Sequence, residues 1–142
     1  MHEYETSMVW SSGRAGRVEV EGLPPLDFAS PPEFAGPGGT WTPEHAFVSA
    51  ANACILLTFV AIAELSKLTF RSLSSSAKGK LEKVEGEGLR FTAIDVEMRV
   101  EVEKEEDIAR AERLVAKAEA SCLVSRSMKT PVRVKAEIQA AG

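Results

Sequence analysis

The chain of 142 residues is long enough for one domain with its own core, and its composition, 44% hydrophobic and 27% charged, is typical of a globular protein. The net charge of −4 gives no electrostatic reason to expect a nucleic acid or an anionic membrane as partner. The first residues lack the basic and apolar segments of a signal peptide. The longest apolar stretch, roughly residues 53–63, is shorter than the about 20 residues that span a bilayer. We therefore expect a single cytoplasmic domain over residues 1–142.

The first 40 residues predict a β-hairpin followed by a long loop. Residues 4–10 and 17–21 have the composition of strands, and residues 11–16 read as the turn between them. Residues 22–40 hold most of the prolines and show no periodicity, which is typical of a functional or unstructured connection. A solvated linker and a loop laid over a dimer partner are both open. Three aromatic side chains indicate that part of this segment packs: Phe28, Phe34 and Trp41.

A long helix is predicted next. Thr42 suits the N-cap and Pro43 the first helical position, and the helical pattern continues to about Leu68. The centre of this segment is apolar on every side. Such a helix is expected to be buried all round.

The second half predicts strands and one amphipathic helix. Residues 72–88 mix turn residues with a possible short strand, whereas residues 94–103 alternate strictly between apolar and charged side chains. Apolar residues then recur at helical spacing over 108–122, and a last strand follows Pro131. The order of elements indicates an α+β fold with antiparallel sheet.

The two cysteines, Cys54 and Cys122, are the first candidates for chemistry. In a reducing compartment they are inert, metal-bound or redox-active. We expect no metal site, because the histidines are His2 and His45 and no paired Cys/His spacing exists. Each thiol alone is best explained as a buried, inert side chain. A reactive thiolate requires a cation within reach.

Charged residues near two turns are the candidate partners of such a thiolate. Arg14 and Arg17 lie in the expected hairpin turn, where each alone reads as a solvated side chain. Glu44 lies in the first turn of the long helix, where an acidic residue complements the helix dipole. His45 reads as a structural residue.

Three short motifs follow one another along the chain: GRAGR at residues 13–17, TPEHAF at 42–47 with ANAC at 51–54, and CLVS at 122–125. They resemble the Gly-Arg-x-Gly-Arg turn, the Pro-Glu helix ending in Ala-x-x-Ala-Cys, and the Cys-Pro-x-Ser segment of the OsmC/Ohr family. This is the family of osmotically induced and organic hydroperoxide resistance proteins. The chain is therefore identified by resemblance as a member of that family.

The resemblance implies an architecture. We expect an α+β OsmC-like fold with an N-terminal antiparallel hairpin or sheet and a long, buried central helix. A second antiparallel sheet with an amphipathic helix completes it. The family also implies an intertwined homodimer with active sites at the subunit interface.

The resemblance also implies a thiol-dependent peroxidase. Cys54 attacks the O–O bond of an organic hydroperoxide and becomes a sulfenic acid, and Cys122 condenses with it to a disulfide. Arg14 holds Cys54 as thiolate, and Glu44 orients Arg14 through an ion pair. An external dithiol, dihydrolipoamide or a lipoylated protein, then reduces the disulfide. No metal or bound organic cofactor is implied.

Two features qualify the resemblance, and two rival functions stay open. Glu44 and Cys54 are 54 − 44 = 10 residues apart, about 15 Å along a straight helix, so we expect a helix break near residues 49–52. Leu123 stands where the family often has proline, which leaves the OsmC and Ohr branches both open. The rivals are a general thiol–disulfide oxidoreductase, for which a Cys-x-x-Cys motif is missing, and a non-catalytic binding or structural dimer.

Overall fold

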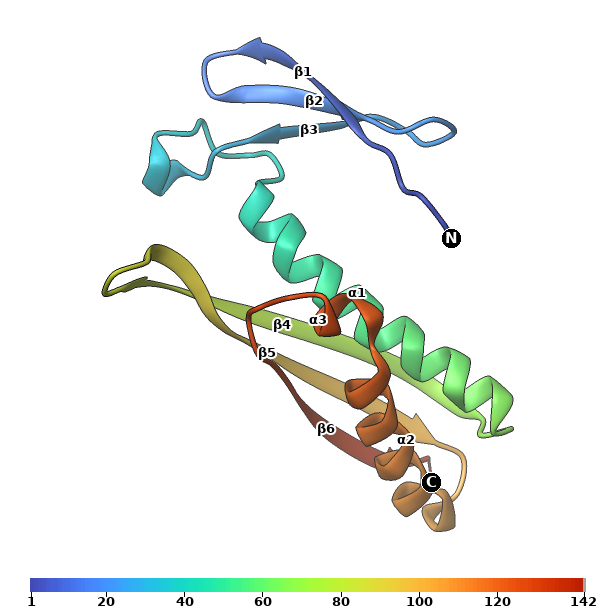
Figure 1. Ribbon diagram of the computed structural model, residues 1–142. Coiled ribbons are helices and arrows are strands. Elements are labelled where there is room, and N and C mark those ends of the chain that lie inside the picture. Colours follow the sequence, from blue (N-terminus) through green and yellow to red (C-terminus); the bar gives the residue numbers. More distant parts are fainter. Residues whose placement is uncertain (142) are drawn as a thin grey trace. The chain divides into compact units, whose positions relative to one another are not determined.

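The computed structural model describes residues 1–141 and divides into two compact units. The first runs from Met1 to Phe47, and the second begins at Val48. Helix α1 (Pro43–Leu65) begins in the first unit and continues into the second (Figure 1). That the two units together form one domain stays a prediction.

The first unit is a three-stranded antiparallel sheet in the order β1-β2-β3. The strands are β1 (Ser7–Ser12), β2 (Ala15–Glu19) and β3 (Leu26–Ala29). The expected hairpin is present, with its turn at Gly13, whose φ of 52° favours glycine. A Cβ on Gly16 would lie 2.8 Å from the backbone oxygen of the neighbouring strand, so glycine is required there too.

The proline-rich segment is more ordered than the sequence predicts. It contains β3 and the 3-10 turn η1 (Pro32–Phe34), and Phe28 forms an isolated bridge with Trp41. The expectation that part of this segment packs is confirmed. The third strand was not predicted, because prolines on both sides of a four-residue strand hide its alternation.

The second unit is built on a sheet in the order β4-β5-β6. Its strands are β4 (Phe70–Val84), β5 (Gly88–Val102) and β6 (Val132–Ala140). The predicted antiparallel arrangement holds for β4 with β5 but is wrong for β6, which pairs with β5 in parallel. The chain returns through a helical crossover, and such a connection brings two strands together in parallel. The possible short strand at 72–88 is in fact the 15-residue β4, whose central half-buried positions carry the small residues Ser75, Ala77 and Gly79.

Three further helical segments separate β5 from β6. They are η2 (Glu105–Asp107), α2 (Ile108–Ser121) and the four-residue α3 (Leu123–Arg126). The alternation predicted for β5 and the amphipathic spacing predicted for α2 are both confirmed by the residues that they bury. These are Ile94, Val96, Met98, Val100 and Val102 on β5, and Ala111, Val115 and Ala118 on α2.

Helix α1 corrects two expectations. It is continuous over 23 residues, so the predicted break near 49–52 is wrong. It is also not buried all round within one chain. Its buried residues form a single stripe at four-residue spacing: Ala51, Ile55, Phe59 and Ala63. On the other side, Leu57 is 63% exposed and Leu65 85% exposed, so an apolar face of α1 lies open.

Helices α1 and α2 lie over the same face of the β4-β5-β6 sheet (Figure 1). The buried stripe of α1 packs on β4, where the rings of Phe59 and Phe70 lie 5.9 Å apart between centroids. Ser75 of β4 donates a hydrogen bond to Asn52 of α1 at 2.7 Å. The opposite face of the sheet carries exposed charged residues. By length and composition alone α1 could cross a membrane, a property that it shares with core helices of globular proteins.

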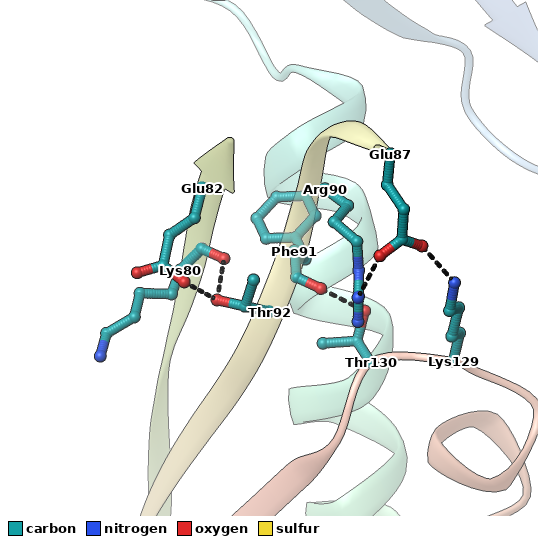
Figure 2. Close-up of polar contacts among 8 residues, drawn as sticks. All are labelled: Lys80, Glu82, Glu87, Arg90, Phe91, Thr92, Lys129 and Thr130. Atoms are coloured by element: carbon teal, nitrogen blue, oxygen red, sulfur yellow. Dashed lines mark hydrogen bonds and ion pairs between the residues drawn. The ribbon is translucent and has the colours of Figure 1, made fainter. Parts of the chain in front are cut away.

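Polar contacts fasten the β4–β5 hairpin to the segment that follows α3 (Figure 2). The Lys129 ammonium lies 2.6 Å from the Glu87 carboxylate, and the Arg90 guanidinium lies 3.1 Å from it. Hydrogen bonds from Lys129 and then from Arg90 hold the pKa of Glu87 below its usual value. Nearby, the buried Thr130 hydroxyl donates to the Phe91 carbonyl at 3.0 Å. The chain that leads from Cys122 into β6 is thereby fixed to the sheet.

Candidate active site

The structure brings the two cysteines together, although they lie far apart in sequence. Cys54 is half-buried in the middle of α1, and Cys122 is fully buried at the junction between α2 and α3. The Cys122 thiol hydrogen-bonds to the Cys54 sulfur. Because both helices cover one face of the same sheet, residues from the two can meet. The two sulfurs therefore form one site.

The surroundings of Cys54 favour its thiolate. Burial of the thiol acts to raise its pKa, since desolvation disfavours the charged form. Hydrogen bonds from the Cys122 thiol, the Val124 N–H, the Thr58 hydroxyl and the Leu123 N–H act in the opposite direction and prevail. The net result is a Cys54 pKa below its usual value. A thiol with a lowered pKa and partial exposure is the reactive kind.

Three of these donors were missed by sequence reasoning. The Leu123 and Val124 N–H groups are free to donate because they belong to the first turn of α3, where backbone donors lack helical partners. Thr58 lies four residues after Cys54, a spacing that places both side chains on one side of a helix. That spacing could have identified Thr58 from the sequence. The amide donors depend on the short helix α3, which no pattern predicted.

The two candidate arginines have different partners in the N-terminal unit. Arg17 forms an ion pair with Asp27 at 3.0 Å across β2 and β3, and the hydrogen bond with Asp27 raises the pKa of Arg17. Arg14 lies in the β1–β2 turn, and its Nη1 donates to the Phe34 carbonyl at 3.0 Å. That neutral contact uses one of the five guanidinium donors. Of the two candidates, Arg14 is therefore the one that forms no ion pair within residues 1–141.

Glu44 and His45 both belong to the first turn of α1. The Thr42 hydroxyl accepts a hydrogen bond from the His45 N–H at 3.0 Å, as expected for an N-cap, and contacts His45 Nδ1 at 2.7 Å. His45 is thus bonded within the cap. The Glu44 Oε1 atom is buried and has no hydrogen-bond partner within residues 1–141. Because α1 is continuous, Glu44 stands about 15 Å along the helix from Cys54 of its own chain.

The four predicted site residues thus fall into two groups. Cys54 and Cys122 meet in the second unit, whereas Arg14 and Glu44 belong to the first. Within residues 1–141, no three side chains of the metal-ligating types are grouped so that they could hold an ion.

Comparison with known families identifies the chain. Residues 36–137 match the family model of OsmC-like proteins, a range that holds α1, β4, β5, most of β6 and both cysteines. The chain belongs to the OsmC-like protein family. The family resemblance carried by the three motifs is confirmed.

The relatives of this OsmC-like protein agree with that assignment. It is 28% identical to the uncharacterized protein YmaD of Bacillus subtilis, over 96% of this chain and 93% of YmaD. An OsmC-like protein of unknown function from Vibrio cholerae superposes with a TM-score of 0.88 at 21% identity, over 96% of this chain and 100% of that one. The organic hydroperoxide resistance protein OsmC of Legionella pneumophila is 27% identical, with a TM-score of 0.73 and 98% of each chain covered. The predicted α+β OsmC-like fold is confirmed.

Proposed function

We propose that this OsmC-like protein is a thiol-dependent peroxidase that reduces organic hydroperoxides through Cys54 and Cys122. The observation that carries the proposal is the contact between the two thiols, together with the lowered pKa of Cys54. The relative from Legionella pneumophila, named for organic hydroperoxide resistance, supports the choice of oxidant. Two inert, buried thiols would not require several hydrogen-bond donors directed at the Cys54 sulfur, so this arrangement favours a reactive thiol.

The reaction follows from the roles of the two sulfurs. The Cys54 thiolate attacks the outer oxygen of R–O–O–H, the O–O bond breaks, and the alkoxide leaves as ROH after taking up a proton. Cys54 is oxidised to the sulfenic acid. Cys122 then attacks the Cys54 sulfur, a disulfide forms, and water leaves. An external dithiol, for which we propose dihydrolipoamide or a lipoylated protein, reduces the disulfide and is itself oxidised.

We propose that Arg14 stabilises the Cys54 thiolate and that Glu44 orients Arg14. The continuous α1 keeps Glu44 away from Cys54 of its own chain, so the pair would act across the interface of a homodimer. Two observations support this arrangement. The Glu44 Oε1 atom is buried without a partner within residues 1–141, and α1 exposes an apolar face that includes Leu57. A guanidinium stays charged at every working pH, which suits a permanent thiolate partner.

The substrate class and location complete the proposal. Cys54 lies on an apolar helix beside Leu57, which favours an alkyl hydroperoxide over hydrogen peroxide. A reaction that starts from two free thiols and uses an external dithiol as reductant suits a reducing compartment, so the cytoplasmic location stays a prediction.

Counting free thiols tests the proposal. One equivalent of tert-butyl hydroperoxide at neutral pH is expected to remove both thiols of the wild type. Cys122→Ser is expected to stop at a Cys54 sulfenic acid that dimedone labels, and Cys54→Ser is expected not to react. A general thiol–disulfide oxidoreductase would instead react with a small disulfide at least as fast as with the hydroperoxide. Unchanged thiols would indicate the non-catalytic dimer and end the proposal.

A further inference from the structure

Thr58 contributes a hydroxyl to the Cys54 sulfur that no recognised motif contains. It lies one helical turn after Cys54 on α1, on the same side of the helix, and is half-buried. Its Oγ1 lies 3.8 Å from the Cys54 Sγ, within hydrogen-bonding range for sulfur. The two side chains therefore form a pair within one element, held by the helix itself.

The orientation of this hydroxyl differs from that of other hydroxyls near helices in the chain. Ser121 Oγ donates to the Lys117 carbonyl at 2.6 Å, and Ser127 Oγ donates to the Leu123 carbonyl at 2.8 Å. Both bonds run back four residues to the backbone, as Ser and Thr in helices commonly do. Within residues 1–141, the hydrogen-bond contact of the Thr58 hydroxyl is with the Cys54 sulfur instead. This hydroxyl is thus available to the thiol.

We propose that Thr58 is a positioning residue, whose hydroxyl donates to the Cys54 thiolate and holds the sulfur toward Cys122. A thiolate has no proton to give, so in the reactive state the Thr58 O–H is the donor. The same bond restricts the side-chain rotation of Cys54. The consequence of this hydrogen bond for catalysis rests on the proposed peroxidase function, whereas its effect on the pKa of Cys54 does not.

The other groups around the sulfur are few enough for the effect of Thr58 to be separated. From the α2–α3 junction, the titratable neighbour is Cys122, and the N–H groups of Leu123 and Val124 are neutral. From the partner subunit of the proposed dimer, Arg14 and Glu44 would be the charged groups. Replacing Thr58 leaves all of these in place, so a shift in the titration of Cys54 reports the lost hydroxyl.

The test is the pH profile of Cys54 alkylation by iodoacetamide, with the labelled cysteine located by peptide mass spectrometry. Thr58→Val keeps the side-chain shape and removes the donor. Loss of one hydrogen bond to the thiolate is expected to raise the midpoint by about 0.4–1 pH unit. Thr58→Ser restores the donor and is expected to titrate like the wild type. A Thr58→Val profile that superimposes on the wild type overturns the proposal, and so does a Thr58→Ser profile that moves as far as Thr58→Val.

A second variant and a second readout keep the outcomes separate. If Thr58→Val does not fold, Thr58→Ala takes its place, with the same upward shift expected relative to Thr58→Ser. Hydroperoxide consumption is measured on the same samples. If the wild type consumes no hydroperoxide, the proposed function is refuted. The alkylation profiles still decide the role of Thr58 in that case. If the wild type consumes hydroperoxide but Thr58→Val leaves the alkylation profile unchanged, only the proposed role of Thr58 is refuted.

Discussion

The two units of the molecule differ sharply in how much they bury. In the N-terminal unit every residue of β1 is exposed, and the sheet presents large apolar side chains to solvent, among them Trp10 at 73% exposure. In the second unit, β5 alone buries five large apolar side chains beneath α1 and α2. Burial of apolar surface is the main stabilising term in folding. The second unit therefore has a core of its own, whereas the sheet of the first unit leaves large apolar side chains exposed.

This difference separates the two halves of the proposed site. The Cys54 sulfur and its hydrogen-bond donors belong to the second unit, whose core is well packed. The proposed cation and its carboxylate belong to the poorly buried unit. Assembly with a second copy would cover the exposed sheet and bring the cation to the sulfur in one event. Dimerisation would then be a requirement for activity as well as for stability.

The largest expected effect is on the core of the second unit. Phe59 is fully buried and contacts Phe70, so Phe59→Ala is expected to lower the free energy of unfolding by about 3–5 kcal/mol. Phe34→Ala in the N-terminal unit is the matched control. Phe34 is half-buried, and its carbonyl contact with Arg14 survives the substitution, so about 1 kcal/mol or less is expected. Urea denaturation measures both, and equal losses would contradict the contrast between the units.

Much of this fold could be predicted where a single local rule decides the structure. The Thr42-Pro43 start of α1 follows from capping, the strict alternation of residues 94–102 gives β5, and helical spacing gives α2. Rules of longer range were needed elsewhere. The middle of β4 carries Ser75, Ala77 and Gly79 at its half-buried positions, so the alternation in hydrophobicity is weak there. The parallel pairing of β6 depends on the path of the α2 crossover, which no local pattern encodes.

The candidate site likewise has parts that local sequence patterns predict and parts that depend on packing. The two cysteines and the preference for Arg14 came from motifs, since residue type and order are enough for them. The expected break in α1 was wrong because it was inferred from the spacing of Glu44 and Cys54, whereas residues 49–52 contain no proline or glycine that would interrupt a helix. The amide donors at α3 were missed because a four-residue helix has no periodicity to read. A motif therefore nominates candidate residues, whereas the hydrogen-bond donors around Cys54 depend on packing.

The second effect concerns the cation from the N-terminal unit. Arg14→Ala is expected to slow the reaction of Cys54 with tert-butyl hydroperoxide by about 10- to 100-fold, the value of one hydrogen bond to a charged group. Arg17→Ala is the matched control, because Arg17 is already paired with Asp27, and a change of less than about threefold is expected. Stopped-flow measurement of thiol oxidation compares the two. Equal slowing would show that the wrong arginine was chosen.

The smallest effect concerns a donor from the well-packed unit. Leu123→Pro removes the N–H that donates to Cys54 at the first position of α3, where proline fits a helix. The preceding Cys122 already has φ −61° and ψ 113°, a conformation that precedes proline readily. The pKa of Cys54 is lowered in the folded protein, so losing one donor moves it up by about 0.4–1 unit. The thiolate fraction at pH 7 then falls, and so does the alkylation rate.

Leu123→Ala is the control, since it shortens an exposed side chain and keeps the N–H. Its alkylation profile is expected to match the wild type. The sign also fixes a stability effect: a lowered thiol pKa stabilises the folded state above the unfolded pKa, and this contribution is lost as pH falls through the folded pKa. Leu123→Pro is expected to reduce that pH-dependent part and leave stability at acid pH unchanged. If Leu123→Pro and Leu123→Ala give the same profile, the leucine amide does not act on Cys54. The hydrogen bonds from Cys122, Val124 and Thr58 would then account for the lowered pKa of Cys54.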